Sequence, residues 1–175
     1  MTSSTPATAR ALRNASSESP SKGSAVGSRS VDTPIGTLWL SRDEHGLSRV
    51  DFDGRRGARS EDPLLAEAEA QLHAYFAGER QRFELPLSPR GTDFQRRVWT
   101  AVGAIPYGET TTYSALAAVV GSPTAWRAVG AANGRNPLPV LVPCHRVLGA
   151  AGALTGYGGG LERKRALLDL ERAAG

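Results

Sequence analysis

Apolar and polar residues alternate over two short stretches near the start of the chain, and this spacing predicts strands. Residues 36–40 and 47–52 have the aromatic and aliphatic character of paired strands, and the polar run at 43–46 between them is typical of a turn. A third short strand is predicted around residues 83–85.

Between the second and third of these strands, the apolar spacing becomes helical. Apolar side chains recur at helical intervals from residue 64 to 76, after an Asp62-Pro63 pair that suits a first turn. Gly78 predicts the end of this helix. Together with the strands, the helix indicates a small α/β unit that carries no evident chemistry of its own, since its histidines are predicted to lie in the turn and on the helix face: His45 and His73.

A second unit follows a linker that contains proline and glycine, at residues 86–91. Residues 91–93 are a favourable helix start. The helix predicted after them carries one apolar stripe, which is most simply explained by packing against a core. The stripe consists of Phe94, Val98, Trp99 and Val102.

Two further helices are predicted close together in the second unit. Threonines at 110–112 offer capping oxygens for a helix over 113–121, and Ser122 is predicted to cap another helix at about 124–132. A tight turn between two short helices is typical of a helix-turn-helix. Small residues dominate the second helix, which suits close approach to a groove.

Three segments are therefore expected along the chain. Residues 1–29 are rich in Ser, Ala, Thr and Pro and hold few large apolar groups, so a disordered tail is expected there. An N-terminal α/β domain over 30–89 and a C-terminal helical domain over 90–175 follow, which gives an α+β fold.

Composition and charge narrow the function classes. The chain has a net charge of +4, and residues 90–175 hold ten basic and five acidic side chains, which favours a polyanion as partner of that half. No apolar run approaches the roughly 20 residues of a membrane span, so no membrane association is expected. One cysteine supplies neither an internal disulfide nor a cysteine-rich zinc site, and no metal is predicted.

That single cysteine lies in the most informative segment. A predicted strand at 140–142 leads through Pro143 to Cys144, which His145 and Arg146 follow directly. A lone cysteine is usually a small buried hydrophobic residue. An imidazole and a guanidinium nearby, however, favour a thiolate, and the imidazole can take the thiol proton directly or through a water. Cys144 is therefore a candidate nucleophile.

The same segment resembles a known family. Pro143-Cys144-His145-Arg146, with Asn136-Pro137 before it and the run 156–161 (GYGGGL) after it, is similar to the signature of the O6-alkylguanine-DNA alkyltransferases. The similarity covers most of 90–172 and is weaker over 31–89. Further matching positions are Phe94, Pro106, Tyr107, Gly108, Glu109, Thr110, Tyr113 and the run 127–130.

The resemblance implies a ribonuclease H-like N-terminal domain and a winged-helix-like C-terminal domain, and it assigns chemical roles. Cys144 matches the alkyl acceptor, and His145 matches the base that activates it through a bound water. Glu171 matches the acid that orients this histidine. Asn136 matches a residue that braces the reactive segment. Tyr113 matches the tyrosine that helps rotate the nucleotide out and donates a hydrogen bond to the leaving guanine.

The resemblance also assigns contacts with DNA and with the substrate. Arg127 matches an arginine that enters the base stack where the damaged nucleotide has left. Other DNA contacts are expected from the small-residue helix, through Ala128, Gly130, Ala131 and Asn133. The substrate pocket is expected to include Tyr157, Gly158, Val147, Lys164 and Pro139.

The implied activity is repair of duplex DNA. An alkyl group on O6 of guanine, or O4 of thymine, moves to Cys144 after nucleotide flipping, and the stable thioether limits each molecule to one turnover. No cofactor is expected. The protein is expected to act as a monomer, with cooperative binding along DNA left open, in the cytoplasm and in association with the nucleoid of a prokaryote. Gly158 stands where some relatives have serine, which affects the range of alkyl groups accepted.

Two other functions are weighed against this one. A binding-only relative would flag lesions for another pathway, but such proteins replace the acceptor cysteine, which this chain retains as Cys144. A helix-turn-helix regulator would bind an operator sequence and would give no reason for the motif at 144–146.

Overall fold

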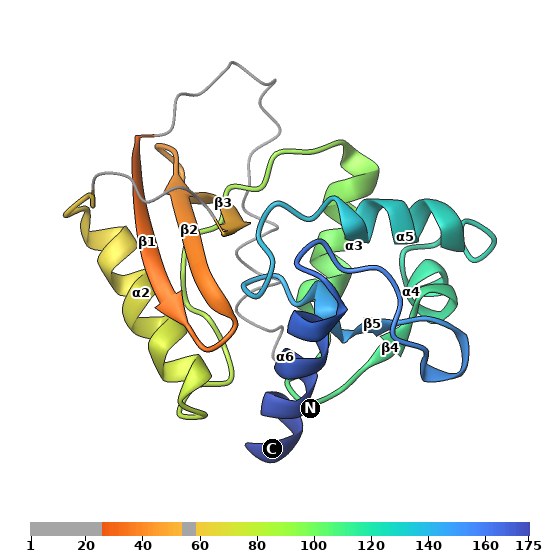
Figure 1. Ribbon diagram of the computed structural model, residues 1–175. Helices are drawn as coiled ribbons and strands as arrows, with labels where there is room; N and C mark the ends of the chain where they lie inside the picture. Colours follow the sequence, from red (N-terminus) through yellow and green to blue (C-terminus); the bar gives the residue numbers. More distant parts are fainter. Residues whose placement is uncertain (1–25, 54–58) are drawn as a thin grey trace, which may run out of the picture.

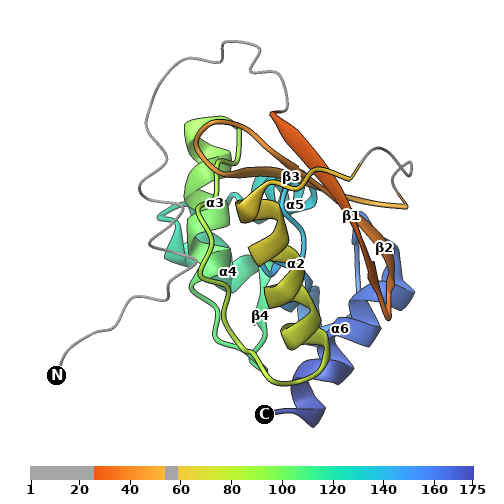
Figure 2. The same cartoon turned by 90° about the vertical axis from the view of Figure 1, so that its left-hand side faces the viewer.

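The computed structural model describes residues 26–53 and 59–175. Within them, the N-terminal unit is an antiparallel sheet in the order β1-β2-β3, formed by β1 (Gly27–Thr33), β2 (Gly36–Arg42) and β3 (Leu47–Phe52). Helix α2 (Pro63–Phe76) covers one face of this sheet, as Figure 2 shows. The strands β2 and β3 and the helix confirm the sequence pattern.

Strand β1 was not predicted, and it changes the limit of the expected tail. Most of that tail, residues 1–25, lies outside the described residues, whereas 27–29 belong to β1. This strand is polar: of its side chains only Val31 and Arg29 are buried. It forms because the edge of β2 offers a backbone ladder, with Val31 opposite Leu38, and not because of a strong apolar pattern.

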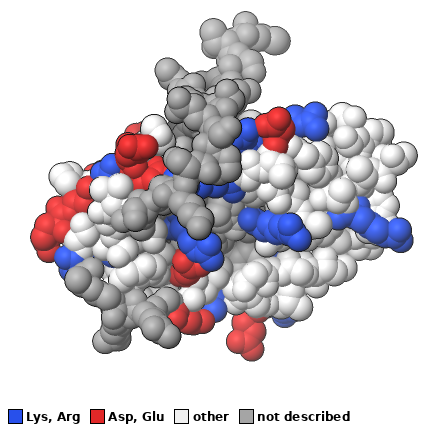
Figure 3. Space-filling model, turned by 90° about the horizontal axis from the view of Figure 1, so that it is seen from above, with Lys and Arg blue, Asp and Glu red and all other residues white. Residues whose placement is uncertain are grey.

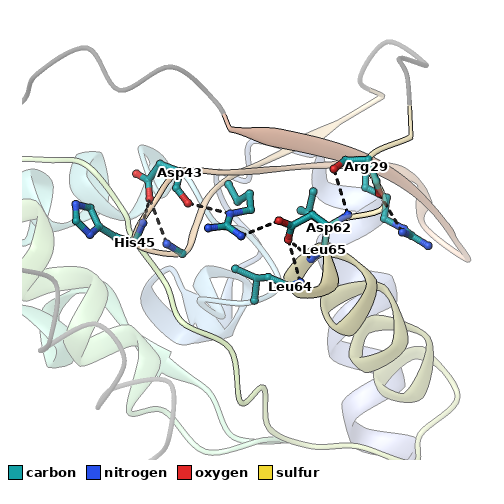
Figure 4. A network of polar contacts seen from close by, with 9 residues as sticks. Arg29, Asp43, His45, Asp62, Leu64 and Leu65 are labelled. Atoms are coloured by element: carbon teal, nitrogen blue, oxygen red, sulfur yellow. Dashed lines mark hydrogen bonds and ion pairs between the residues drawn. The ribbon is translucent and has the colours of Figure 1, made fainter.

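The start of α2 is tied to the sheet through Asp62, the N-cap residue. Its carboxylate accepts hydrogen bonds from the backbone N–H groups of Leu64 and Leu65 and pairs with Arg42 of β2 at 2.8 Å (Figure 4). Gly78, at φ +76°, follows the helix end as predicted. In the turn before β3, Asp43 accepts hydrogen bonds from the backbone N–H groups of residues 45 and 46 (Figure 4).

The predicted strand at 83–85 is wrong. This segment is extended, and Phe83, Leu85 and Leu87 alternate inward with exposed Glu84 and Pro86, so the sequence has the spacing of a strand. Only an isolated bridge joins it to the sheet, between Leu47 and Leu87. Alternate burial along an extended chain thus occurred here without a ladder of hydrogen bonds.

The C-terminal unit is helical. It consists of α3 (Asp93–Gly103), α4 (Tyr113–Val119), α5 (Trp126–Gly134) and α6 (Leu161–Ala173), with two-residue parallel strands β4 (Thr111–Thr112) and β5 (Val147–Leu148) and 3-10 turns η1 (Cys144–Arg146) and η2 (Ala150–Gly152). Thr92 and Gln95 form a capping box at α3. The predicted stripe of α3 is its core face, where Trp99 donates from its indole to the carbonyl of Ala132 on α5 at 2.8 Å.

Helices α4 and α5 form the predicted helix-turn-helix. Thr112 caps α4 by accepting from the N–H of Ala115, as predicted. Ser122 does not cap α5: that helix begins at Trp126 after Ala125 and has no side-chain cap. The turn between the helices is therefore longer than the sequence pattern suggested.

Residues 140–142 form a tight turn instead of the predicted strand. The N–H of Val142 donates to the carbonyl of Leu138 at 2.8 Å, and Val140 has a φ of +72°, a strained value for a β-branched residue. The prolines at 137, 139 and 143 lack the N–H that a central strand needs. The apolar run is buried because it lies in the core, and not because it is a strand.

Helix α6 lies between the sheet and the helices α3–α5 (Figure 1) and contacts both units. Arg163, near its start, donates to the carbonyl of Ile35 and pairs with Asp53 at 2.6 Å, which ties α6 to the end of the sheet where β2 begins and β3 ends. Among the described residues, no helix is both long and apolar enough to cross a membrane.

Candidate active site

Cys144 begins η1, directly after the turn at 138–143, and only 6% of the residue is exposed. The carboxamide of Asn136 shapes this turn by accepting from the N–H of Leu138 and donating to the carbonyl of Val142, both at 2.9 Å. Asn136 also favours the thiolate of Cys144, since its side chain lowers the pKa of that thiol. The predicted bracing role of Asn136 therefore agrees with its contacts.

Asn133 was expected at a DNA surface, and this expectation is wrong. Its side chain is buried, with 3% of the residue exposed, and its amide donates to the carbonyl of Cys144 at 3.3 Å. Asn133 follows buried Val129 by four positions, so both residues lie on the inner face of α5. Asn133 thus supports the reactive segment from within α5.

His145 and Glu171 form a fully buried pair. Their Nε2 and Oε1 atoms lie 2.8 Å apart. Because an ionised carboxylate only accepts hydrogen bonds, Nε2 carries the hydrogen and Nδ1 keeps its lone pair. Nδ1 has no hydrogen-bond partner among the described residues. The pair is therefore arranged as a base whose free nitrogen is available for a proton.

Glu171 also accepts hydrogen bonds from three other residues, and one of them, Tyr75, was not singled out from the sequence. Arg146 donates to both carboxylate oxygens, from Nε at 2.9 Å and from Nη2 at 2.8 Å. Tyr75, on α2, donates from its hydroxyl to Oε1 at 2.7 Å, and the N–H of Gly108 donates to Oε2 at 3.2 Å. No local signal identifies Tyr75, since it fits the apolar stripe of its helix and meets Glu171 only in the folded chain.

The pKa values of these groups define the resting protonation state. Burial raises the pKa of the Cys144 thiol to about 11, despite opposing effects of Asn136 and the charge of Lys164. Burial lowers the pKa of His145 against the pull of Glu171. Burial opposes ionisation of Glu171, but hydrogen bonds from His145 and Arg146 outweigh it and hold that pKa well below its ordinary value. At neutral pH the site thus holds a thiol, a neutral imidazole and a carboxylate.

Lys164 and the segment after β5 form one wall beside Cys144. The buried ammonium of Lys164 donates to the carbonyls of Val147, at 2.7 Å, and Thr155, at 2.8 Å. It therefore holds the main chain on both sides of η2 together, and its charge favours the thiolate of Cys144. Val147 is fully buried, and its neighbour Leu148 is buried with 7% of the residue exposed.

The loop at 156–160 packs against the N-terminal unit. The ring of Tyr157 meets that of Phe52 edge-on, with centroids 5.8 Å apart, and the hydroxyl of Tyr157 is buried without a partner among the described residues. Gly159 lies so close to Phe52 that a Cβ there would come within 2.7 Å of the ring. Gly158 is exposed. Pro139, predicted in the same pocket, is buried in the turn at 138–143.

A groove of about 550 Å³ opens beside this segment, between the helix-turn-helix and η2. Tyr113 and Arg127 line it, as does Gly130, which lies beside the Tyr113 ring. The hydroxyl of Tyr113 donates to the carbonyl of Thr155 at 3.4 Å. The other lining residues are Thr112, Ser114, Trp126, Gly149, Ala150 and Thr155. Cys144 is not part of this lining, and Ala128 and Ala131 are exposed on α5 outside it.

Charge is distributed unevenly over the two units. In the face shown in Figure 3, acidic side chains gather over the N-terminal unit, and separate basic side chains stand among mostly uncharged atoms over the C-terminal unit. Within the described residues, no group of three or more His, Cys, Asp or Glu side chains is placed to hold a metal ion.

Both units match models of known protein families. Residues 28–89 match a family model described as the 6-O-methylguanine DNA methyltransferase ribonuclease-like domain, and residues 93–173 match the DNA binding domain of the same family. The chain belongs to the 6-O-methylguanine DNA methyltransferase family. This agrees with the resemblance in the sequence and with the expected fold of both domains.

Relatives of this methyltransferase-family chain match it over most of their length. The methylated-DNA–protein-cysteine methyltransferase of Mycobacterium tuberculosis is 50% identical over 151 residues, which is 83% of this chain and 92% of the relative. The constitutive enzyme of that name from Bacillus subtilis is 50% identical over 153 residues, 81% of this chain and 93% of the relative. The crystal structure of Mycobacterium tuberculosis OGT in complex with DNA superposes with a TM-score of 0.78 at 50% identity, covering 85% of this chain and 94% of that one.

Proposed function

We propose that this protein repairs duplex DNA by moving the alkyl group of O6-alkylguanine onto its own Cys144. The observation that carries the proposal is the buried arrangement of Cys144 directly before a histidine whose Nε2 is fixed to Glu171 at 2.8 Å, next to the groove of a helix-turn-helix. Relatives at 50% identity bear the name methylated-DNA–protein-cysteine methyltransferase, and one related structure holds DNA.

The reaction is a single displacement. The thiol proton of Cys144 passes to Nδ1 of His145, directly or through one water, and Glu171 stabilises the imidazolium that forms. The Cys144 sulfur forms a bond to the alkyl carbon while the bond between that carbon and O6 breaks. The guanine takes up one proton from the hydroxyl of Tyr113, which lines the groove, and leaves neutral, and the imidazolium of His145 returns its proton through solvent to restore that hydroxyl. The thiol hydrogen is thus replaced by the alkyl group, and guanine gains one proton.

The damaged base must leave the stack before this step, which costs a few kcal/mol. Arg127 and Tyr113 line the same groove, and α5 presents small residues that let its backbone approach a minor groove. We infer that Arg127 fills the place of the flipped nucleotide and that Tyr113 guides it toward Cys144. Exposed Ala128 and Ala131 contact the DNA backbone in this arrangement.

The substrate pocket is inferred to lie between the loop at 156–160 and the wall beside Lys164. Tyr157 and Val147 line this pocket, and Lys164 holds its main chain in place. Backbone N–H groups near Gly158 take the hydrogen-bonding role of the serine that some relatives have there. O4-alkylthymine is included as a second substrate. The thioether is stable, so each molecule acts once and needs no cofactor. We further propose that the protein works as a monomer, inside the cell and at the nucleoid.

Mass spectrometry of the intact protein and of its peptides tests this function. After incubation with duplex DNA that contains O6-methylguanine, we expect one methyl group on the Cys144 peptide for each molecule, and restored guanine in the DNA. Tight lesion binding without a mass gain would instead support the lesion-flagging protein. Neither signal, with binding to one operator sequence, would support a regulator.

A further inference from the structure

Tyr75 joins the N-terminal unit to the active site. It lies on α2 and is fully buried, and its hydroxyl donates to Oε1 of Glu171 at 2.7 Å. The same oxygen accepts from Nε2 of His145 at 2.8 Å. A side chain from the ribonuclease-like domain therefore shares an acceptor atom with the base of the other domain.

This sharing has an electrostatic consequence. Each hydrogen bond to an oxygen reduces the negative potential that the oxygen exerts on its other partners. Burial and the neighbouring Glu171 raise the pKa of Tyr75, so it remains a phenol and acts only as a donor. With its hydroxyl in place, the carboxylate is held in one orientation and attracts a proton on His145 less strongly.

We propose that Tyr75 is a positioning residue for alkyl transfer: through Glu171 it fixes the orientation of His145 and keeps that imidazole neutral. The proposal rests on the relay described under the proposed function. It gives the N-terminal domain, which has no evident chemistry of its own, a direct part in the reaction. The titratable or charged groups around the His145–Glu171 pair are Tyr75 from α2, Tyr107 from the loop before β4, Cys144 and Arg146 from η1, Tyr157 from the loop at 156–160, and Lys164 from α6.

A Tyr75→Phe substitution tests the proposal because it removes one hydroxyl and keeps the ring. The single-turnover rate of the full-length chain is measured against pH with free O6-benzylguanine, so that DNA binding does not enter. We expect a three- to tenfold lower rate at neutral pH, roughly the net value of one hydrogen bond. We also expect the acidic limb to move to higher pH, since the less shielded carboxylate stabilises the imidazolium.

Tyr107→Phe is the matched control. The Tyr107 ring lies 6.0 Å from that of Tyr75, and its buried hydroxyl has no partner among the described residues. This variant should keep the wild-type rate and acidic limb. If the acidic limb of Tyr75→Phe does not move, the proposal is overturned. This holds even if the rate and the melting temperature both fall, because such a combination would mean that Tyr75 only packs in the core. Absence of a mass gain on wild-type Cys144 would instead refute the proposed function.

A second, independent observation concerns Trp126, the first residue of α5. The residue is 47% exposed, it lines the groove, and the guanidinium of Arg127 lies 4.7 Å from the centroid of its ring. Exposed indole beside a cation suits contact with nucleic acid, because a base or sugar can pack on the ring. The ring also holds Arg127 at the edge of the groove before DNA arrives.

We infer that Trp126 is a further DNA-contact residue, which holds Arg127 ready and packs on the duplex once Arg127 has entered the stack. This too rests on the proposed function. Trp126→Ala should slow repair of O6-methylguanine in duplex DNA several-fold and leave the reaction with free O6-benzylguanine unchanged, and Trp126→Phe should lie between. Val119→Ala, at another exposed apolar residue outside the groove, serves as control. The inference would be overturned if Trp126→Ala and Val119→Ala repaired duplex DNA at the same rate. It would also be overturned if Trp126→Ala slowed the reaction with free O6-benzylguanine as much as the reaction with duplex DNA.

Discussion

Burial makes Cys144 a poor nucleophile until its proton is removed. With the thiol pKa raised to about 11, very little thiolate exists at neutral pH. His145 lies next to it in sequence, is neutral because burial lowers its pKa, and leaves Nδ1 free. At the scale of single residues, reactivity therefore depends on a base that is ready to accept, and not on a permanently ionised sulfur.

Because His145 acts as the base and Cys144 as the nucleophile, the pH dependence of a His145→Gln variant can be predicted. The wild-type rate should stay nearly constant from about pH 7 down to below the ordinary histidine pKa of about 6.5, because the lowered pKa keeps His145 neutral there. The variant should be slow at neutral pH, and its rate should rise about tenfold per pH unit toward about pH 9, since thiolate forms directly as pH approaches the pKa of Cys144. Single-turnover rates with free O6-benzylguanine measure both. A flat profile for the variant would contradict this account.

The same buried groups make the folded protein less stable in acid. The pKa values of His145 and Glu171 are both lower than their ordinary values, so the unfolded chain binds more protons. Stability is therefore complete above the ordinary histidine pKa of about 6.5 and falls as pH drops through the lowered folded values.

Removing the sulfur separates chemistry from binding. Cys144→Ala deletes a small group that is 6% exposed, while Asn133 and Asn136 still hold the backbone on either side. Methyl transfer should be abolished, whereas affinity for duplex DNA with O6-methylguanine should remain within about threefold of wild type. Mass spectrometry and fluorescence anisotropy measure the two properties. Loss of both would mean that Cys144 is structural.

At the scale of elements, the helix-turn-helix separates recognition from catalysis. Arg127 lies on α5 in the groove, whereas the groove lining does not include Cys144. Lys164 holds together the main chain on both sides of η2, and Thr155 of this segment also lines the groove. Under the proposed function, the damaged nucleotide must leave the duplex and move past the groove lining to reach Cys144.

Arg127→Ala tests that separation. We expect at least a tenfold slower repair of O6-methylguanine in duplex DNA, because the extruded state loses the group that fills its gap. The reaction with free O6-benzylguanine should keep its wild-type rate. Arg135→Ala, at the exposed C-cap of the same helix, removes an equal charge and is the control. Equal slowing on duplex and free base would refute the proposed role.

At the scale of the whole molecule, the N-terminal domain supports the active site at two places. Tyr75 contacts Glu171, and Phe52 packs on Tyr157 and under the guanidinium of Arg163, 5.0 Å from the ring centroid. The two units are thus coupled through the groups that bound the reactive cysteine.

Gly159→Ala should expose this coupling. The new methyl group would come within 2.7 Å of the Phe52 ring, so the loop at 156–160 must shift. We expect transfer to slow several-fold with both duplex DNA and free O6-benzylguanine. In a Phe52→Ala background the obstacle is gone, and adding Gly159→Ala should then change the rate less than twofold. Additive effects in this double-mutant cycle would show that the loop is not positioned by Phe52.

The sequence determined much of this protein through local patterns. The helical spacing of α2 and α3, the caps at Asp62, Thr92 and Thr112, and the helix-turn-helix all depend on residues close together in the chain. The order of matching residues around Cys144 identified the family. Strand β1 and the turn at 138–143 escaped these rules, because the first is stabilised by the edge of β2 and the second by the amide of Asn136.

Only the tertiary structure decided how the catalytic groups meet. By itself Glu171 has the pattern of an ordinary helix residue, and its role was assigned only by resemblance. In the folded chain it lies between Tyr75, 96 positions away, and the pair His145 and Arg146. Such a contact leaves no trace in local spacing, because its energy comes from charges and donors brought together in a buried space, where a carboxylate is stable only if every neighbour donates to it.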